Sequence, residues 1–372
     1  MKIAFRTFII FLVFISLNTD LYSCSCLSLH TSNQIVFGRN HDYSNPYGVI
    51  IYNPKNQLKV GVPLPGEHIV GWKAIYSSIT ISSVGVGFAN SGMNEKGLAM
   101  GHMGLNESVY PNKDDRPIIV PSQWIQYMLD ICANTDEVIN EAKKIRITDR
   151  RGSGTHYYMC DREGNVAIIE FLKGQMVVHT NKDISYTVLC NDTYEKSMND
   201  IKYYKGLGGD KNVLDRVSIL NENAIPDVMA LGCTKINQFY KKESKNIVQD
   251  AFDIHYAMRC PGNINAPQFE NSETQYTTVF DVTNSKLYFR TNLNPTIREI
   301  NFKDFEDNCS NKAKLLDIQT PAEGIVNKSF VDYSMQENGK CIYKFYENES
   351  NKMSKEDMEF MSFYPEFFQC EK

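Results

Sequence analysis

The chain has 372 residues, of which 42% are hydrophobic and 22% are charged. This length and this balance allow a buried core in one or two domains, and they exclude a disordered or fibrous chain. The formal net charge of -5 argues against a broad basic surface for nucleic acid, and we expect no nucleic-acid partner.

The N-terminal segment has the pattern of a secretory signal peptide. Lys2 and Arg6 precede an apolar run at 8–17, and a polar stretch then leads to Ser23 and Cys24. The run is shorter than the about 20 residues that a bilayer span requires. We therefore expect residues 1–23 to be removed and the mature chain to be exported, to a periplasm or to the extracellular space. No integral membrane span is expected.

Cutting after Ser23 would leave Cys24 as the first residue of the mature chain. Residues Leu21 to Cys24 also loosely resemble a bacterial lipoprotein signal, although Tyr22 fits that signal poorly. A lipidated cysteine has lost its thiol and has an acylated amine, whereas an unmodified N-terminal cysteine keeps both groups. The pattern around Cys24 leaves the two interpretations open.

Strand and helix patterns follow along the chain. Alternating apolar residues around a Ser32-Asn33 turn predict a hairpin over residues 24–39. Helical spacing predicts one helix over 122–133 and a second helix that Thr135 caps and that runs through Ile145. Further strands are expected at 79–88, 166–171, 176–179, 186–189, 277–282 and 286–290, the last two joined by a turn at Asn284-Ser285. Hairpin-rich sets of strands with helices grouped between them predict a layered α+β domain of stacked sheets.

The usual motifs of metal and phosphate chemistry do not occur. The seven histidines show no metal-ligand spacing, and there is no phosphate-loop pattern, zinc-protease motif or paired CxxC, so we expect neither a metal nor a cofactor. An N-terminal cysteine offers another chemistry, because its thiol is a nucleophile and its α-amine, with a pKa near 7.7–8.0, is a general base. Such a residue needs a carboxylate to orient the amine, a cation that favours the thiolate, and amide donors for an oxyanion.

Several segments of the chain carry a family resemblance. In chain order they are CSCLSL (24–29) followed by FGRNHDY (37–43), GMNEKGL (92–98), LCNDTY (189–194), LDR (214–216) and LYFR (287–290). Together they resemble the choloylglycine hydrolase and penicillin V acylase family, which are linear-amide C–N hydrolases of the N-terminal nucleophile superfamily. The resemblance implies a four-layer αββα sandwich of two antiparallel sheets over residues 24–302. Residues 303–372, richer in Lys, Glu, Asn and Phe, are then a C-terminal extension.

The resemblance also implies a role for each matching side chain. Cys24 is the nucleophile, and its α-amine is the base. Asp42 holds that amine, and Arg39 lies beside the thiol and favours its ionised form. Asn191 donates its side-chain amide to the oxyanion, and Arg216 completes the polar cluster.

Two features depart from the family pattern. Asn94 itself is expected to fix a tight turn. The family pattern places a second oxyanion donor about ten residues after it. At that position this chain has Gly104, which has no side-chain donor. Asn106 is the candidate for that donor if the chain has a small insertion. Cys26 lies two residues after Cys24, on the same face of an extended strand, but Cys24 fits the spacing to the later motif better.

Other interpretations of these residues stay open. Arg39 and Asp42, taken alone, would pass for an ordinary surface ion pair of little energy. Asn191 begins a glycosylation sequon, and a glycan there would block the oxyanion role. His41 and His102 are expected to be packing or surface residues.

The implied function is cleavage of an amide between an acyl group and an amine, through a thioester on Cys24. The substrate would be a small molecule with an apolar acyl group, and conjugated bile salts, phenoxyacetyl-type penicillins, N-acyl amines and N-acyl homoserine lactones all fit. Acyl transfer to another amine is an enzymatic alternative. A non-catalytic surface lipoprotein, lipidated at Cys24, is the alternative from another class. Self-association into a homo-oligomer stays open.

The ten cysteines limit the disulfides that can form. A catalytic Cys24 leaves nine, so at least one more cannot pair within the chain. We expect Cys190 to be a buried thiol on the strand face opposite Asn191. A disulfide between Cys341 and Cys370 is expected to hold the C-terminal extension.

Overall fold

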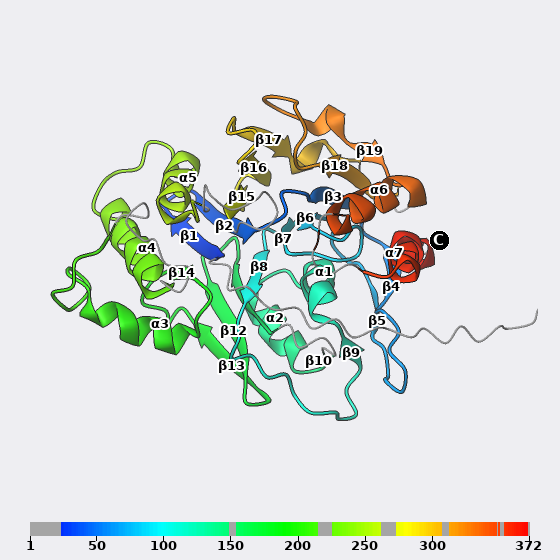
Figure 1. Ribbon diagram of the computed structural model, residues 1–372, viewed down its shortest axis with the longest axis horizontal. Coiled ribbons are helices and arrows are strands. Elements are labelled where there is room, and N and C mark those ends of the chain that lie inside the picture. Colours follow the sequence, from blue (N-terminus) through cyan, green and yellow to red (C-terminus); the bar gives the residue numbers. More distant parts are fainter. Residues whose placement is uncertain are drawn as a thin grey trace, which may run out of the picture.

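Two large antiparallel sheets face each other, with helices on both outer faces (Figure 1). The structure is a computed structural model that describes residues 24–148, 154–214, 225–261, 273–306, 312–347, 349 and 353–370. The expected signal peptide at 1–23 and the expected site residue Arg216 lie outside these ranges. None of the helices in the described part of the chain is long and apolar enough to cross a membrane.

The six-stranded sheet contains the N-terminal hairpin that the sequence predicts. Its strands, in order across the sheet, are β14 (Val188–Leu189), β1 (Ser25–His30), β2 (Ile35–Tyr43), β15 (Glu273–Asp281), β16 (Lys286–Thr291) and β17 (Arg298–Asn301). The hairpin partners run from Ser25 opposite Asn40 to His30 opposite Ile35. Because β15 pairs with β2, the last predicted hairpin lies directly beside the first one.

The nine-stranded sheet is also antiparallel throughout. Its strands, in order, are β13 (Gln175–Thr180), β12 (Val166–Leu172), β11 (Thr155–Cys160), β8 (Ala99–Gly104), β7 (Ser91–Asn94), β6 (Ser78–Ser82), β3 (Val49–Asn53), β18 (Lys314–Asp317) and β19 (Val331–Asp332). The strand predicted at 79–88 ends early, at Ser82. Gly85 and Gly87 follow with φ of 89° and 90°, a left-handed conformation that departs from regular strand geometry and that glycine adopts readily.

Two small sheets and seven α-helices complete the structure in the described ranges. The small sheets pair β9 (Ile118–Ile119) with β10 (Arg146–Ile147), and β4 (Gln57–Val60) with β5 (Gly71–Lys73) and β20 (Gln369–Cys370). The helices are α1 (Pro121–Ile131), α2 (Thr135–Ala142), α3 (Tyr194–Asp200), α4 (Ile225–Phe239), α5 (Ile247–Met258), α6 (Met335–Tyr346) and α7 (Lys355–Phe363). Short 3-10 turns occur at Ile201–Tyr203, Phe302–Asp304, Asn327–Ser329 and Tyr364–Phe367.

Helix α2 differs from its prediction at both ends. Its N-cap is Asn134, whose side chain accepts a hydrogen bond from the backbone N–H of Glu137 at 3.0 Å. Thr135 is therefore the first helical residue and not the cap, in keeping with the stronger capping preference of asparagine. The helix ends at Ala142, and Ile145 lies beyond it, where the chain turns toward β10.

Three apolar cores separate the layers. Side chains such as Phe37, Ile79 and Tyr158 pack between the two sheets. Leu27 and Leu29 of β1 point the other way, into the core under α4 and α5. A third core lies between the nine-stranded sheet and the helices α1 and α2. The order helix, sheet, sheet, helix confirms the predicted αββα sandwich.

The chain after residue 302 adds to the edge of the nine-stranded sheet. Strand β18 pairs with β3, and β19 follows at the edge. Helices α6 and α7 pack against each other and lie beside these strands, at the right of Figure 1. The domain boundary at residue 302 stays a prediction.

The predicted disulfide between Cys341 and Cys370 is wrong. Cys370 is disulfide-bonded, whereas Cys341 is in no disulfide. Cys341 packs from α6 against the apolar cluster around Val49 and Leu315. Cys370 pairs through its backbone with Gln57 in the small three-stranded sheet.

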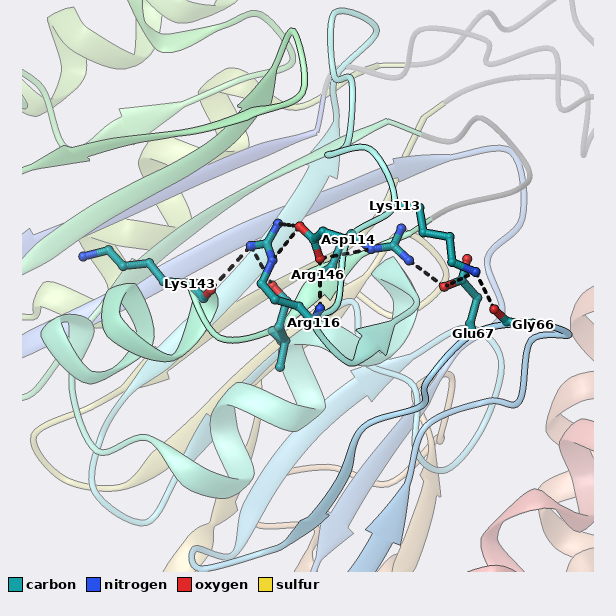
Figure 2. A network of polar contacts seen from close by, with 8 residues as sticks. Gly66, Glu67, Lys113, Asp114, Arg116, Lys143 and Arg146 are labelled. Carbon is teal, nitrogen blue, oxygen red and sulfur yellow. Dashed lines mark hydrogen bonds and ion pairs between the residues drawn. The ribbon is translucent and has the colours of Figure 1, made fainter.

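A network of charged side chains fixes the long segment between β8 and β9 (Figure 2). Arg146 of β10 is buried and donates from Nη2 to Glu67 Oε2 at 2.6 Å. Lys113 reaches the same carboxylate at 3.6 Å. Arg116 donates from Nε to Asp114 Oδ2 at 2.9 Å. The network ties this segment to the β4–β5 loop and to β10.

Candidate active site

The strand register brings the predicted site residues together around the start of β1. Leu189 of β14 lies opposite Cys26, and Asn40 of β2 lies opposite Ser25. Continuing both registers by one or two residues sets Cys24 between Asn191 on one side and the end of β2 on the other. Segments that are far apart in the sequence therefore meet at one end of the six-stranded sheet.

The thiol of Cys24 is buried between the two sheets. Its Sγ donates to the backbone carbonyl of Asp42 at 3.6 Å, and it belongs to the same apolar core as Cys26. Burial raises the pKa of the Cys24 thiol to about 11; the positive charge of Arg39 opposes the rise and the negative charge of Asp42 adds to it. The thiol is thus protonated at neutral pH, so a nucleophilic reaction here requires a base that takes its proton.

Arg39 is a buried cation held by two histidine residues. Its Nε and Nη2 donate to the carbonyl of His102 at 3.2 and 3.0 Å, and its Nη1 lies 3.1 Å from Nδ1 of His41. Burial, together with the charge of Arg39, holds the pKa of His41 well below its usual range, so the ring is neutral and accepts this hydrogen bond. Arg39 and Asp42 are 3% and 1% exposed, which excludes the surface ion pair considered from the sequence.

Asp42 is positioned from the neighbouring strand β15. Thr274 is its cross-strand partner, and the hydroxyl of Thr274 donates to Oδ1 of Asp42. The backbone N–H of Cys260 in turn donates to Oγ1 of Thr274 at 2.8 Å, and the N–H of Thr274 donates to the carbonyl of Cys260 at 3.0 Å. The sequence missed Thr274, because the strand predicted from residue 277 begins four residues earlier.

Asn191 lies at the end of β14 and contacts the nine-stranded sheet. Its Nδ2 donates to the carbonyl of Gly104, the last residue of β8, at 2.9 Å. The amide has two hydrogens, so a second one is available for a substrate oxygen. The side chain is 4% exposed. A glycan on Nδ2 would have to displace this buried contact, which argues against the sequon interpretation.

The second oxyanion candidate does not join this group. Asn106 is exposed in the turn after β8. Gly104, where the family register falls, contacts Asn191 through its backbone instead. No contact joins Asn106 to Cys24 or to Asn191 among the residues that the structure describes.

Two further predictions near the site are confirmed. Asn94 fixes a tight turn: its Oδ1 accepts from the N–H groups of Lys96 and Leu98, and Gly97 has a φ of 84°. Cys190 is buried in the core under α4 and α5, on the helix side of the six-stranded sheet. The alternation of side chains along a strand was enough to predict that face.

The site resembles no metal centre. Within the described ranges, no group of three or more His, Cys, Asp or Glu side chains is placed to hold a metal ion. What the geometry offers is a thiol, a fixed guanidinium, a carboxylate and an amide donor within a few strand positions. This set suits acyl transfer to sulfur, in which negative charge develops on a carbonyl oxygen.

Comparison with known proteins gives matches along most of the chain. The sequence profile of the linear amide C-N hydrolases, choloylglycine hydrolase family, matches residues 24–222 and 228–314. A penicillin V acylase from Pectobacterium atrosepticum is 27% identical over 278 residues, which cover 67% of this chain and 73% of that protein.

Solved structures have the same fold. A penicillin V acylase from Agrobacterium tumefaciens superimposes with a TM-score of 0.70 and 24% identity, over 84% of this chain and 98% of its own. A mutant of conjugated bile acid hydrolase from Clostridium perfringens superimposes with a TM-score of 0.64 and 19% identity, over 82% of this chain and 99% of its own.

Proposed function

Because the chain belongs to the choloylglycine hydrolase family of linear amide C-N hydrolases, we propose that it cleaves an acyl–amine bond through a thioester on Cys24. The enzyme is a hydrolase that acts on carbon–nitrogen bonds other than peptide bonds, in linear amides. The observation that carries the proposal is the convergence of a buried thiol, Arg39, Asp42 and Asn191 at one end of the six-stranded sheet.

The proposal requires that residues 1–23 are removed during export, because the α-amine of Cys24 is a base only when it is free. In the first step, the sulfur of Cys24 attacks the carbonyl carbon of the substrate and the thiol proton moves to this amine. The carbonyl oxygen becomes negative and accepts a hydrogen bond from Nδ2 of Asn191. The raised pKa of the thiol supports this order, since proton removal has to accompany the attack.

The intermediate then breaks in two stages. The carbon–nitrogen bond cleaves, the leaving amine takes the proton from the Cys24 ammonium group, and the acyl group stays on sulfur as a thioester. A water molecule gives a proton to the same α-amine and attacks the thioester carbon. As the carbon–sulfur bond breaks, the ammonium group returns this proton to the sulfur, which restores the thiol and releases a carboxylic acid. Arg39 stabilises the sulfur whenever it carries negative charge, and Asp42 keeps the ammonium group oriented.

The similarity to a penicillin V acylase supports a small amide with an apolar acyl group as the substrate. The fold shared with a conjugated bile acid hydrolase makes a conjugated bile salt the second probe. Detection of the free carboxylic acid distinguishes hydrolysis from acyl transfer to another amine.

Two cysteine variants test the nucleophile. Cys24→Ser should abolish the covalent acyl intermediate and turnover of penicillin V, while the far-ultraviolet circular dichroism stays that of the parent. Cys26→Ser, a matched change two residues later in the same core, should keep turnover. If Cys26→Ser is the inactive variant, the assignment of the nucleophile is wrong.

Intact-mass analysis of the purified chain tests the N-terminus. A mass that corresponds to an unmodified Cys24 as first residue is expected. A diacylglyceryl group on this residue would rule out the mechanism and support the surface lipoprotein.

A further inference from the structure

The end of the chain lies outside the family match and beside the candidate site. The matched residues end at 314. The penicillin V acylase structure from Agrobacterium covers only 84% of this chain, although 98% of its own length is matched. The family model therefore leaves the residues after 314, here called the C-terminal segment, unmatched, and their contacts with the matched residues show what this segment holds in place.

These contacts converge on the loop that follows Asp42. The loop joins β2 to β3, and each of its middle residues touches the C-terminal segment. Pro46 accepts a hydrogen bond through its carbonyl from Nε2 of Gln319 at 2.7 Å. The ring of Tyr47 lies 4.2 Å from Nζ of Lys344.

The strongest contacts are made at the end of β2 itself. Tyr43, the residue after Asp42, donates its hydroxyl to Oε2 of Glu349 at 2.8 Å. Asn45 is fully buried and donates to Oε1 of the same carboxylate at 2.9 Å and to the carbonyl of Phe345 at 2.7 Å. The rings of Tyr43 and Phe345 stack with centroids 5.9 Å apart and an angle of 8°.

Glu349 thus holds Tyr43, the last residue of β2, and Asn45, two residues beyond it, with one carboxylate. Both donors lie within the residues that the family model matches, and the acceptor lies beyond them. Burial raises the pKa of Glu349, and the hydrogen bonds from Asn45 and Tyr43 oppose that rise because they favour the ionised form. An ionised acceptor with two donors in a water-poor environment makes stronger hydrogen bonds than a neutral one. Movement of Tyr43 would be passed directly to Asp42, because the two are adjacent in the same strand.

We propose that the C-terminal segment is a positioning element of the active site, in which Glu349 and Phe345 hold the end of β2 so that Asp42 keeps the α-amine of Cys24 in its reactive position. This inference rests on the proposed function, in which Asp42 orients the α-amine of Cys24. Glu349 itself is a positioning residue and touches no reacting atom.

The test compares Glu349→Ala with Glu347→Ala in the full mature chain. Glu347 is exposed on the same segment and serves as the matched control. The first measurement is the rate at which iodoacetamide alkylates Cys24 as a function of pH, followed by peptide mass mapping, which needs no substrate. The charged and titratable groups that affect the thiol, Arg39, Asp42 and Cys260, are unchanged in both variants. The second measurement is kcat and KM with penicillin V.

We expect the alkylation profile of Glu349→Ala to shift to higher pH, because a misplaced amine removes the thiol proton less well. Its kcat should fall by roughly tenfold or more, the usual effect of a small displacement in an active site, with KM changed by less than about twofold. The Glu347→Ala control should match the parent in both measurements.

A parent-like alkylation profile and kcat in folded Glu349→Ala would overturn the proposal. If that variant does not fold, the same measurement is made on Tyr43→Phe, which removes only the hydroxyl donor and keeps the ring stacked on Phe345. An unchanged alkylation profile of Cys24 in Tyr43→Phe would equally overturn the proposal. If the parent turns over no probe but the profile still shifts, the positioning role stands and the substrate proposal fails.

Discussion

Asn191 uses one amide hydrogen for its own position, and the proposed mechanism uses the other. Its Nδ2 donates to the carbonyl of Gly104 at 2.9 Å. Replacement by alanine removes both interactions while leaving the strand backbone unchanged. We expect Asn191→Ala to lower kcat by about 10²–10³, the usual loss on removing one oxyanion donor, and to leave KM close to that of the parent. Steady-state kinetics with penicillin V give both constants.

Asn106→Ala is the matched control for this prediction. The residue has the same chemistry but lies exposed in the turn after β8. Its variant should keep the kcat of the parent. An equal loss of kcat in both variants would mean that Asn106 moves toward the substrate when it binds and that the oxyanion site is shared.

Glu170 is a buried carboxylate that holds the segment after Asn191. Its Oε1 accepts the backbone N–H of Tyr194, the first residue of α3, at 2.9 Å. His156 and His179 lie 3.3 Å from its two oxygens, one on each neighbouring strand. The carboxylate therefore connects the nine-stranded sheet to the helix that begins three residues after Asn191.

Replacement of Glu170 should change how stability depends on pH. Burial alone would raise the pKa of Glu170, but the hydrogen bonds from His156, His179 and the N–H of Tyr194 lower it well below its ordinary value of 4.5. A depressed folded-state pKa means that the carboxylate stabilises the fold above pH 4.5 and that this contribution is lost as the pH falls toward the lowered pKa. Glu170→Gln should lower the free energy of unfolding at neutral pH by about 3 kcal/mol, as for a broken buried pair.

Urea unfolding at several pH values measures this effect. The parent should lose stability as the pH falls below 4.5 more steeply than Glu170→Gln does. Equal slopes in the two proteins would show that Glu170 is not ionised in the fold.

Single residues could be predicted where the sequence carries a motif, and not where a contact depends on register. Cys24, Arg39, Asp42 and Asn191 stand in recognisable segments, and the structure brings them together. Thr274 stands in no motif, and only the pairing of β15 with β2 sets it against Asp42. Arg216 was predicted in the same way as Asn191 and stays a prediction.

Gly101 shows how strand β8 allows the two sheets to approach at the site. A Cβ at this position would lie 3.0 Å from the ring of Phe37, 3.1 Å from Cδ of Arg39 and 3.1 Å from Sγ of Cys26. All three atoms belong to the opposite sheet. Gly101→Ala should therefore lower the free energy of unfolding by about 1–3 kcal/mol through overpacking, and it should lower kcat because Arg39 has to move.

Gly71→Ala on β5 provides the comparison. Its Cβ would meet only the carbonyl of Lys59, at an ordinary distance of 3.7 Å. This variant should keep both stability and kcat. Thermal unfolding and steady-state kinetics measure the two effects, and a Gly101→Ala variant that behaves like Gly71→Ala would mean that the sheets have room to separate.

Elements were predicted best where a local pattern decides them. Strands β12, β13 and β16 occur within a residue or two of their predicted bounds, and the N-terminal hairpin occurs as predicted except that β2 continues four residues further, to Tyr43. The strand at 79–88 was predicted too long, because apolar residues continue past Ser82 while the glycines there turn the backbone. An alternating apolar pattern indicates which residues are buried, whether or not they form a strand. Most of the residues just after Ser82 are buried in a loop that α6 covers.

At the scale of the whole molecule, the layers can be predicted from the alternation of apolar side chains along the strands. The contacts that hold distant segments together cannot be predicted in this way. Opposite faces of β1 supply the core between the sheets and the core under α4 and α5, which a periodic sequence pattern predicts. The C-terminal segment is held by polar contacts between distant parts of the chain, such as Glu349 with Tyr43. No local pattern reveals these contacts.

The small three-stranded sheet is fastened to α1 by a buried ion pair. Nζ of Lys59 lies 2.9 Å from Oδ2 of Asp130, and the two side chains are 1% and 0% exposed. The indole N–H of Trp72 donates to the same oxygen at 2.7 Å, and Nε2 of Gln126 donates to Oδ1 at 2.8 Å. The carboxylate is thus the common acceptor for β4, β5 and α1.

Lys59→Met should lower the free energy of unfolding by about 3–5 kcal/mol, because it leaves the charge of Asp130 buried without its cation. Asp130→Leu should be costly for the same reason, with the ammonium group left behind. The double variant removes both charges, so its loss should be smaller than the sum of the two single losses. Urea unfolding of the four proteins gives the coupling, and additivity within about 0.5 kcal/mol would contradict a paired charge. Since neither residue contacts the site, kcat per folded molecule should stay at the value of the parent in all four.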